Sequence, residues 1–177
     1  MNVILVGLRG SGKTTVGRRL AGLLHRPFLD LDEELEREEG LSIAELVGQL
    51  GWGGFRERES ALLRRTCAGD GQVLAVGGGA ILNPDNVRLM RERGFVLWLD
   101  ADPDTLVERL QNDPATTHRR PAFTTGPLIT EIHALAVDRE PLYRRAAHQR
   151  IDTASQSADQ AALAIRELVE DLANGRQ

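Results

Sequence analysis

The sequence predicts a single-domain α/β protein with three layers, in which a five-stranded parallel sheet lies between two layers of helices. Two observations predict this fold class. Short apolar runs alternate with amphipathic stretches along the chain, and the ends of these runs carry glycines and carboxylates. Alternating strands and helices favour a parallel sheet covered on both faces. The length of 177 residues suits one domain spanning 1–177 with a sizeable core.

The elements follow from hydrophobic periodicity and from start signals. We expect strands in the short apolar runs, at residues 2–6, 27–30, 72–76, 95–100 and 149–152. We expect helices in the amphipathic stretches, at residues 13–24, 42–50, 55–68, 84–93, 103–110, 131–147 and 158–173. An acidic helix also opens at Asp32. Ser42 and Glu45 form a capping-box pattern, and Pro84 and Pro103 occupy first-turn positions where proline is tolerated.

Composition and charge narrow the class of protein. Hydrophobic residues make up 41% and the formal net charge is −4, so the sequence gives no reason to expect nucleic acid or anionic lipid as a partner. No stretch approaches the roughly 18 consecutive apolar residues of a membrane-spanning helix, and the N-terminus is predicted as a core strand rather than a signal peptide. The single cysteine, Cys67, is expected to be a small buried apolar group. We therefore expect a cytoplasmic, monomeric protein.

A glycine-rich segment follows the first predicted strand directly. Residues 7–14 read GLRGSGKT and match the phosphate-loop pattern G-x-x-x-x-G-K-[ST]. Backbone N–H groups of such a loop surround phosphate oxygens, and the positive end of the next helix faces the same anion. Lys13 is expected to reach the β- and γ-phosphates, and the Thr14 hydroxyl to ligate Mg²⁺. The expected ATP-binding residues of this segment are Gly10, Ser11, Gly12, Lys13, Thr14 and Thr15. The alternative, a tight turn with a lone lysine, does not explain why strand, loop and helix occur in the required order.

Two further predicted strands also end in chemically useful residues. Ligands of parallel sheets bind beyond the carboxyl ends of the strands. Asp30 and Asp32 close one strand, where one carboxylate suits a magnesium-bound water and the other a substrate hydroxyl. The alternative is that both simply open an acidic helix, where the helix dipole favours carboxylates. Three glycines, 77–79, close the next strand and allow backbone to approach a substrate or phosphoryl group closely.

The combination of motifs resembles that of the shikimate kinases, a branch of the P-loop kinases similar to nucleoside-monophosphate kinases. The resemblance covers about residues 3–153 and rests on GLRGSGKT at 7–14, LDLD at 29–32, FRERE at 55–59, VGGGA at 76–80, RRP at 119–121 and REPLYRR at 139–145. It implies ATP-dependent phosphorylation of shikimate at its 3-hydroxyl, in the chorismate pathway to aromatic amino acids, with one Mg²⁺ per subunit. The alternatives are a related kinase of another small carboxylated metabolite, such as gluconate, or a nucleotide-binding module without catalysis.

The resemblance also implies an acceptor site. Asp32 resembles the aspartate that contacts the shikimate hydroxyls and acts as the base. Arg56 and Arg139 resemble the arginines that hold the shikimate carboxylate, a planar group that suits the guanidinium fork. Gly78 and Gly79 resemble glycines that touch substrate or phosphate through the backbone.

On the donor side the resemblance implies three further roles. Asp30 resembles the aspartate that binds Mg²⁺ through water, and Arg109 resembles an arginine that stacks on adenine. Arg120, directly before Pro121, resembles the lid arginine that closes over the phosphates. The polar segment at about 112–124 is therefore predicted to be a mobile lid, which a kinase needs to exclude water.

The remaining expectations concern a substrate-binding region at about 31–60. Glu59 lies one helical turn after Arg56, so it is placed to pair with that arginine and orient it. Trp52 and Phe55 either line the substrate pocket or belong to the core, which is the commoner fate of a tryptophan.

Overall fold

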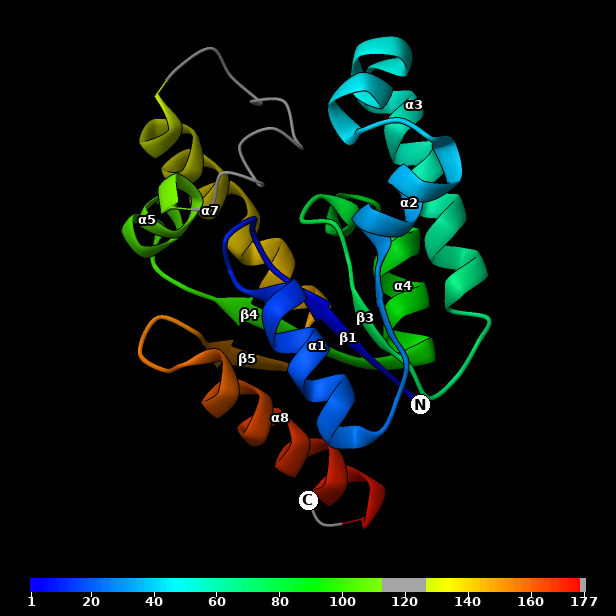
Figure 1. Ribbon diagram of the computed structural model, residues 1–177, viewed down its shortest axis with the longest axis vertical. Helices are drawn as coiled ribbons and strands as arrows, with labels where there is room; N and C mark the ends of the chain where they lie inside the picture. The colour runs from blue at the N-terminus through cyan, green and yellow to red at the C-terminus, as the bar shows by residue number, and fades with distance from the viewer. Residues whose placement is uncertain (113–126, 176–177) are drawn as a thin grey trace.

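The computed structural model describes residues 1–112 and 127–175, and a five-stranded sheet lies at its centre (Figure 1). Every strand pair is parallel, and the strand order is β2-β3-β1-β4-β5. The strands are β1 (Asn2–Val6), β2 (Phe28–Asp30), β3 (Val73–Ala75), β4 (Gly94–Asp100) and β5 (Gln149–Asp152). The predicted fold class is confirmed, and the carboxyl ends of all five strands meet at one edge of the sheet.

The helices connect and cover these strands. They are α1 (Lys13–Leu24), α2 (Leu31–Glu39), α3 (Ile43–Thr66), the short 3₁₀ turn η1 (Ala80–Leu82), α4 (Pro84–Arg93), α5 (Pro103–Asn112), α7 (Leu128–Ala146) and α8 (Ala158–Ala173). The capping box predicted at Ser42 and Glu45 is present at the start of α3. Compared with the sequence prediction, α5 ends two residues later and α7 begins three residues earlier. The turn η1 was not predicted.

The two helices predicted at 42–50 and 55–68 are both present, as the two segments of the kinked element α3, and only the break between them was predicted too long. A single element, α3, runs through both, and only Gly51 leaves the helical conformation, with φ 69° and ψ 173°. A positive φ is readily adopted by glycine, so the chain kinks at that one residue and resumes the helix at Trp52. Gly53 and Gly54 are therefore helical rather than part of a connecting loop.

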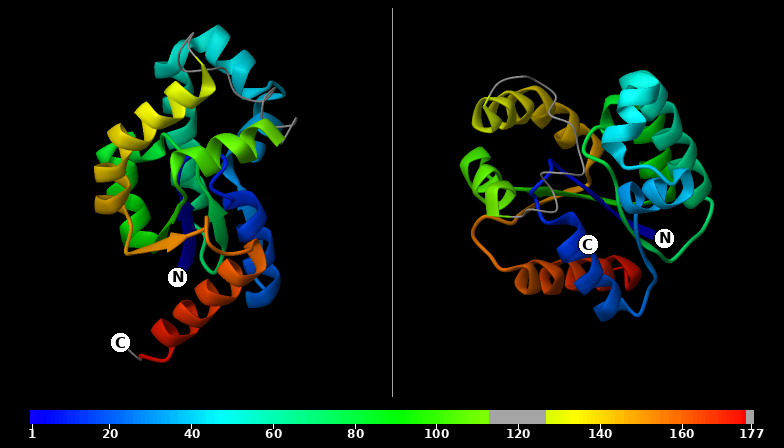
Figure 2. Two further views of the ribbon diagram at one scale, coloured as in Figure 1. Left: turned by 90° about the vertical axis from the view of Figure 1, so that its left-hand side faces the viewer. Right: turned by 45° about the horizontal axis from the view of Figure 1, so that its top comes forward.

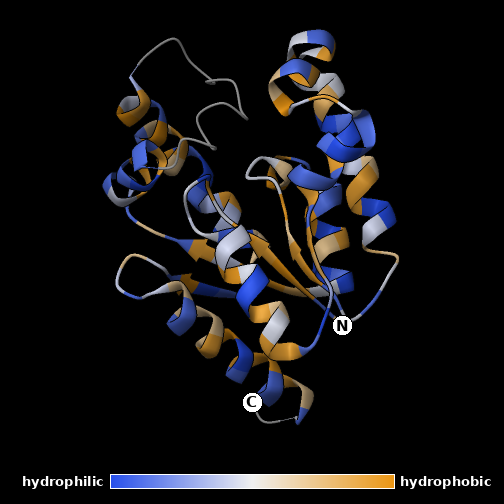
Figure 3. Cartoon of the chain, in the orientation of Figure 1, coloured by the Kyte–Doolittle hydropathy of each residue, from blue (hydrophilic) through white to orange (hydrophobic). Residues whose placement is uncertain are grey.

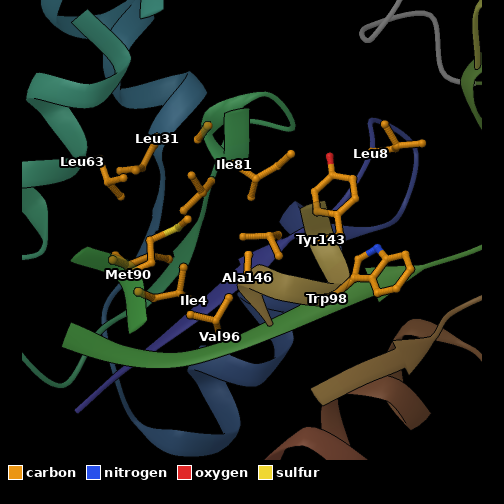
Figure 4. Close-up of a cluster of buried hydrophobic side chains, with 14 of the residues drawn as sticks. Ile4, Leu8, Leu31, Leu63, Ile81, Met90, Val96, Trp98, Tyr143 and Ala146 are labelled. Carbon is orange, nitrogen blue, oxygen red and sulfur yellow. The ribbon is translucent and has the colours of Figure 1, made fainter. Parts of the chain in front are cut away.

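The sheet is buried on both faces, as a parallel sheet requires. Alternate residues of β1 point to opposite sides: Val3 and Leu5 pack with α1 and α8, whereas Ile4 and Val6 pack with the helices of the other layer. Figure 2 shows α1 and α8 together on one side of the sheet, and Figure 3 shows β1, β3 and β4 as mainly hydrophobic. Figure 4 shows part of the larger core, which includes Leu63 of α3, Met90 of α4 and Tyr143 of α7.

The buried residues of this scaffold include Cys67, which ends α3 with no exposed surface, as predicted. Burial raises the pKa of its thiol to about 11. Within residues 1–112 and 127–175, no helix combines the length and apolar character needed to cross a membrane.

Candidate active site

The phosphate loop joins β1 to α1 at the carboxyl edge of the sheet, and its glycines are required by conformation and space. Gly7, Gly10 and Gly12 all have positive φ, at 149°, 81° and 90°. A Cβ on Gly7 would lie 2.7 Å from the Ser11 hydroxyl oxygen and closer still to a carbonyl oxygen of β4. Lys13, the first residue of α1, donates from Nζ to the carbonyl oxygens of Gly7 and Leu8, both at 2.9 Å. The ammonium group is therefore held over the loop that the motif predicts to bind phosphate.

Thr14 and Asp30 bring two oxygen ligands together beside this loop. The Thr14 hydroxyl donates to Asp30 Oδ2 at 2.5 Å, and Asp30 Oδ1 accepts from the backbone N–H of Asp32 at 3.1 Å, which caps α2. Burial and the nearby Asp32 carboxylate raise the pKa of Asp30, while the Thr14 hydrogen bond and the Lys13 charge oppose this shift. An extra cation at this position would relieve the unfavourable burial of the carboxylate.

A cleft of about 660 Å³ opens over these groups. Its walls come from the phosphate loop, the start of α2, the turn after β3, α5 and the β5–α8 connection. Of the predicted site residues, the cleft is lined by Gly10, Ser11, Gly12, Lys13, Thr14, Thr15, Asp30, Asp32, Gly78 and Arg109. The strand ends that were predicted to carry chemistry thus meet in one place. Asp100, at the end of β4, is not among the residues that line the cleft and pairs with Arg150.

The glycine turn after β3 is held by α7. Arg139, only 6% exposed, donates from Nη1 to the Gly78 carbonyl oxygen at 3.1 Å, and the Tyr143 hydroxyl donates to the same oxygen at 2.5 Å. Tyr143 in turn stacks on Trp98 of β4, with ring centroids 5.7 Å apart; Figure 4 shows the two rings side by side. A Cβ on Gly78 would lie 3.0 Å from the Gly7 carbonyl oxygen. The turn is therefore fixed against both α7 and the phosphate loop.

Arg56 of α3 lies on the other glycine of the turn. A Cβ on Gly79 would lie 2.6 Å from Arg56 Nη1 and closer still to Nη2 and Cζ, so only glycine admits the guanidinium there. Arg56 Nη1 donates to Glu59 Oε2 at 2.7 Å, which confirms the predicted pairing, and Glu59 is only 3% exposed. The guanidinium also lies over the rings of Trp52 and Phe55, at 5.4 and 5.1 Å from their centroids.

Trp52 and Phe55 pack on the core and lie beside Arg56. Phe55 is buried and belongs to the core, and Trp52 is half-buried and packs against the same core. The rings meet edge to face, with centroids 5.9 Å apart. Neither lines the described cleft, and both rings support the Arg56 guanidinium.

Arg109 connects α5 to two loops of the cleft. Its guanidinium donates to the Gly10 carbonyl oxygen at 3.3 Å, to the Thr153 hydroxyl at 3.2 Å and to the Thr153 carbonyl oxygen. The Thr153 hydroxyl donates further to the carbonyl oxygen of Ser11 at 3.2 Å. This network fixes the phosphate loop against the β5–α8 connection, which also lines the cleft.

The predicted residues thus form two groups around the glycine turn. One group does not line the described cleft: it consists of Gly79 of the turn and the two arginines that contact the turn, Arg56 and Arg139. The donor-side residues line the cleft itself. Residues 113–126, which hold most of the predicted lid and Arg120, lie outside the described residues. The sequence reasoning missed Tyr143 and Thr153, although Tyr143 belongs to the quoted REPLYRR motif.

The donor set fits Mg²⁺ bound together with a nucleotide. Mg²⁺ prefers oxygen ligands, keeps several waters and usually takes only one or two protein groups besides the substrate phosphates. The Thr14 hydroxyl and the Asp30 carboxylate are such a pair. Among the described residues, no group of three or more His, Cys, Asp or Glu side chains is arranged to hold a metal ion alone. A Mg²⁺ ion held by this pair would take its remaining ligands from water and from the nucleotide phosphates.

Comparisons with known proteins agree with this arrangement. A family model described as Shikimate kinase matches residues 9–170. A shikimate kinase of Symbiobacterium thermophilum is 44% identical over 171 residues, which cover 97% of each chain. A solved shikimate kinase of Acinetobacter baumannii in complex with shikimate matches with a TM-score of 0.91 and 37% identity, covering 99% of this chain and 95% of its own. A shikimate kinase of Bacteroides thetaiotaomicron matches with a TM-score of 0.86 and 29% identity, covering 96% of this chain and 98% of its own.

Proposed function

This chain belongs to the shikimate kinase family, and we propose that it transfers the γ-phosphoryl group of ATP to the 3-hydroxyl of shikimate. The product is shikimate 3-phosphate, an intermediate on the route to chorismate and the aromatic amino acids. One observation supports this most strongly: Gly78 lines the cleft of the phosphate loop, Arg139 holds its carbonyl oxygen, and Arg56 lies on the adjacent glycine. A phosphate-binding loop and a pair of carboxylate-binding arginines thus meet at one turn.

At the donor end, the residues of the chain position and neutralise charge. Phosphoryl transfer passes through a state in which negative charge spreads over the transferred oxygens, so a fixed cation nearby lowers its energy. Lys13 is held over the loop by two carbonyl groups and supplies that charge. Thr14 and Asp30 would hold one Mg²⁺, Asp30 through water, and the metal would neutralise the β- and γ-phosphates. The adenine is expected beside Arg109, and Arg120 stays the predicted lid arginine.

At the acceptor end, the carboxylate of shikimate selects the substrate. Arg56 and Arg139 come from two different helices, α3 and α7, and contact neighbouring glycines of the Gly77–Gly79 turn, so both are assigned to the carboxylate of one ligand. Charge-assisted hydrogen bonds of this kind contribute about 1.5–3 kcal/mol each. The backbone of Gly78 and Gly79 contacts the acceptor or the phosphoryl group between them.

Asp32 is the residue we assign to the reacting hydroxyl. It lines the cleft beside Asp30, and its backbone N–H is fixed by the Asp30 carboxylate. Asp32 accepts the hydrogen of the 3-hydroxyl and aims its oxygen at the γ-phosphorus. As the new P–O bond forms and the bond to the ADP oxygen breaks, the hydroxyl proton passes to the Asp32 carboxylate. We further propose that one chain suffices for the reaction and that it acts as a monomer in the cytoplasm.

A coupled assay of ADP release tests the proposal. Initial rates are measured with ATP, Mg²⁺ and shikimate, beside gluconate and a control without acceptor. Turnover that depends on shikimate, together with a phosphorylated product in equal amount, supports the proposal. Turnover with gluconate instead would show that the arginines read a different carboxylate. Nucleotide binding without turnover on either acceptor would refute the assigned reaction.

A further inference from the structure

The phosphate loop carries an arginine that the motif leaves unspecified. Arg9 occupies one of the variable positions of the loop, lines the cleft and is 13% exposed as a side chain. Its guanidinium pairs with Glu131, which lies in the first turn of α7 and is 2% exposed. The two residues are 122 positions apart in the sequence. A carboxylate buried to this degree requires a cation, so the fold fixes where the Arg9 side chain lies.

The two residues just before Arg9 pack on the glycine turn. The Gly7 carbonyl oxygen and the Leu8 Cα lie 3.0 and 3.7 Å from where a Cβ of Gly78 would be, so this segment packs directly on the glycine turn. The next segment, from Gly10 to Thr14, leads into the N-terminus of α1. Arg9 therefore lies between residues 7–8, which touch the glycine turn, and residues 10–14, which are predicted to bind phosphate.

One helix holds both sides of this junction. From its first turn, α7 reaches the phosphate loop through Glu131, and further along it reaches the glycine turn through Arg139 and Tyr143. The donor and acceptor residues are thus fixed to the same rigid element. Arg9 also lines the same cleft as Lys13 and Asp32, between which the proposed function transfers the phosphoryl group.

From this geometry we infer that Arg9 binds the phosphoryl group in transfer and that Glu131 is the positioning residue that holds its guanidinium in place. The inference rests on the proposed function, because it assumes that the cleft transfers a γ-phosphoryl group. A guanidinium has five N–H donors in a fixed fork, so a carboxylate can set its orientation while it also binds a phosphoryl oxygen. In this arrangement Arg9 contacts the γ-phosphate and not the α- or β-phosphate.

The affinities of two nucleotides test the role of Arg9. Arg9→Gln and Arg9→Lys are compared with the unsubstituted protein by calorimetric titration with Mg²⁺–ADP and with Mg²⁺–AMP-PNP, an ATP analogue that keeps a γ-phosphoryl group. We expect Arg9→Gln to weaken AMP-PNP binding at least about 10-fold, because a charge-assisted contact is lost, with ADP affinity within about twofold. Arg9→Lys keeps the charge but not the fork, so its loss is expected to be smaller. Equal losses for both nucleotides, or none for AMP-PNP, would overturn the inference.

Glu131→Gln tests the positioning role, with Glu140→Gln as the matched control. Glu140 lies on the same helix and pairs with Arg144 at the surface. Glu131→Gln is expected to lower kcat and AMP-PNP affinity together and to leave ADP affinity and the KM for shikimate within about twofold, because it loosens the Arg9 guanidinium with which Glu131 pairs. The double variant Arg9→Gln/Glu131→Gln is expected to be no worse than Arg9→Gln alone. Additive losses, or a rise in KM for shikimate with kcat unchanged, would contradict the positioning role.

The nucleotide affinities test the role of Arg9 independently of the proposed reaction with shikimate. Nucleotide binding does not require an acceptor, so a protein that fails to phosphorylate shikimate still reports whether Arg9 reads the γ-phosphoryl group. If Glu131→Gln does not fold, the comparison of Arg9→Gln with Arg9→Lys alone decides the inference, since Arg9 is the residue that touches the ligand.

Discussion

Gly79→Ala is the change that tests the acceptor site with the smallest perturbation. Gly79 has φ −105°, a value that any residue adopts, so the backbone does not demand glycine there. Glycine is required there by the nearby Arg56 side chain, because the added Cβ would lie 2.6 Å from its Nη1 and closer still to Nη2 and Cζ. The guanidinium is the far end of a flexible side chain. It will therefore move away at little cost to stability, but it will leave the position in which it faces the acceptor.

The size of the effect follows from the lost contact. If Arg56 holds the shikimate carboxylate, displacing it removes a charge-assisted interaction of about 1.5–3 kcal/mol. That loss corresponds to a rise of roughly 10- to 150-fold in the KM for shikimate. The KM for ATP is expected to stay within about twofold, since Gly79 does not line the described cleft over the phosphate loop. The melting temperature is expected to fall by only a few degrees.

The assay is the initial rate of ADP release at varied shikimate and saturating ATP, with thermal denaturation run in parallel. Gly53→Ala is the matched control, because it makes the same substitution in α3 at a glycine with no atom within 4 Å of the added Cβ. The control is expected to keep both KM values. An unchanged KM for shikimate in Gly79→Ala, in a folded protein, would refute the assignment of Arg56 to the carboxylate.

Three other predictions follow from the donor side and the core. Lys13→Ala is expected to lower kcat by at least about 100-fold in a folded protein, because the fixed charge at the loop is lost; a near-normal kcat would contradict its role. Asp30→Asn is expected to raise the melting temperature of the ligand-free protein near pH 7 by about 2–4 °C for each kcal/mol recovered, because the charged form is disfavoured in the fold. Because the pKa of Asp30 is raised in the folded protein, the destabilising cost of its charge is present above that pKa and vanishes below the unfolded value of 3.8. A stability gain of Asp30→Asn that grows as the pH falls would contradict this prediction. The Cys67 thiol, with its pKa near 11, is expected to be about one part in a thousand thiolate at pH 8 and to resist a disulfide reagent until the protein unfolds; rapid native-state labelling would show that the site opens.

The features that the sequence predicted are those set by neighbours along the chain. The strand, loop and helix around Lys13 follow from a contiguous motif, and the capping box at Ser42 from two residues three apart. The pairing of Arg56 with Glu59 also follows from helical spacing. In each case the interacting groups lie within one turn or one loop, so local geometry alone fixes their relation.

The features that it missed depend on contacts between distant segments. The bonds from Tyr143 to Gly78 and from Arg109 to Thr153 join residues 65 and 44 positions apart. No spacing rule relates such residues before the sheet order is known. The length of the break between the two segments of α3 was predicted wrongly for a different reason. Four residues rich in glycine are typical of a loop, yet the packing of α3 on the core keeps three of them helical.

The most direct test of the central claim compares two acceptors that differ only in the carboxylate. The value of kcat/KM is measured for shikimate and for its methyl ester, which keeps the ring and hydroxyls but removes the charge. If Arg56 and Arg139 each contribute about 1.5–3 kcal/mol to holding the carboxylate, the ester is expected to be poorer by at least about 100-fold. An ester that reacts as well as shikimate would contradict the claim that these two arginines select the substrate.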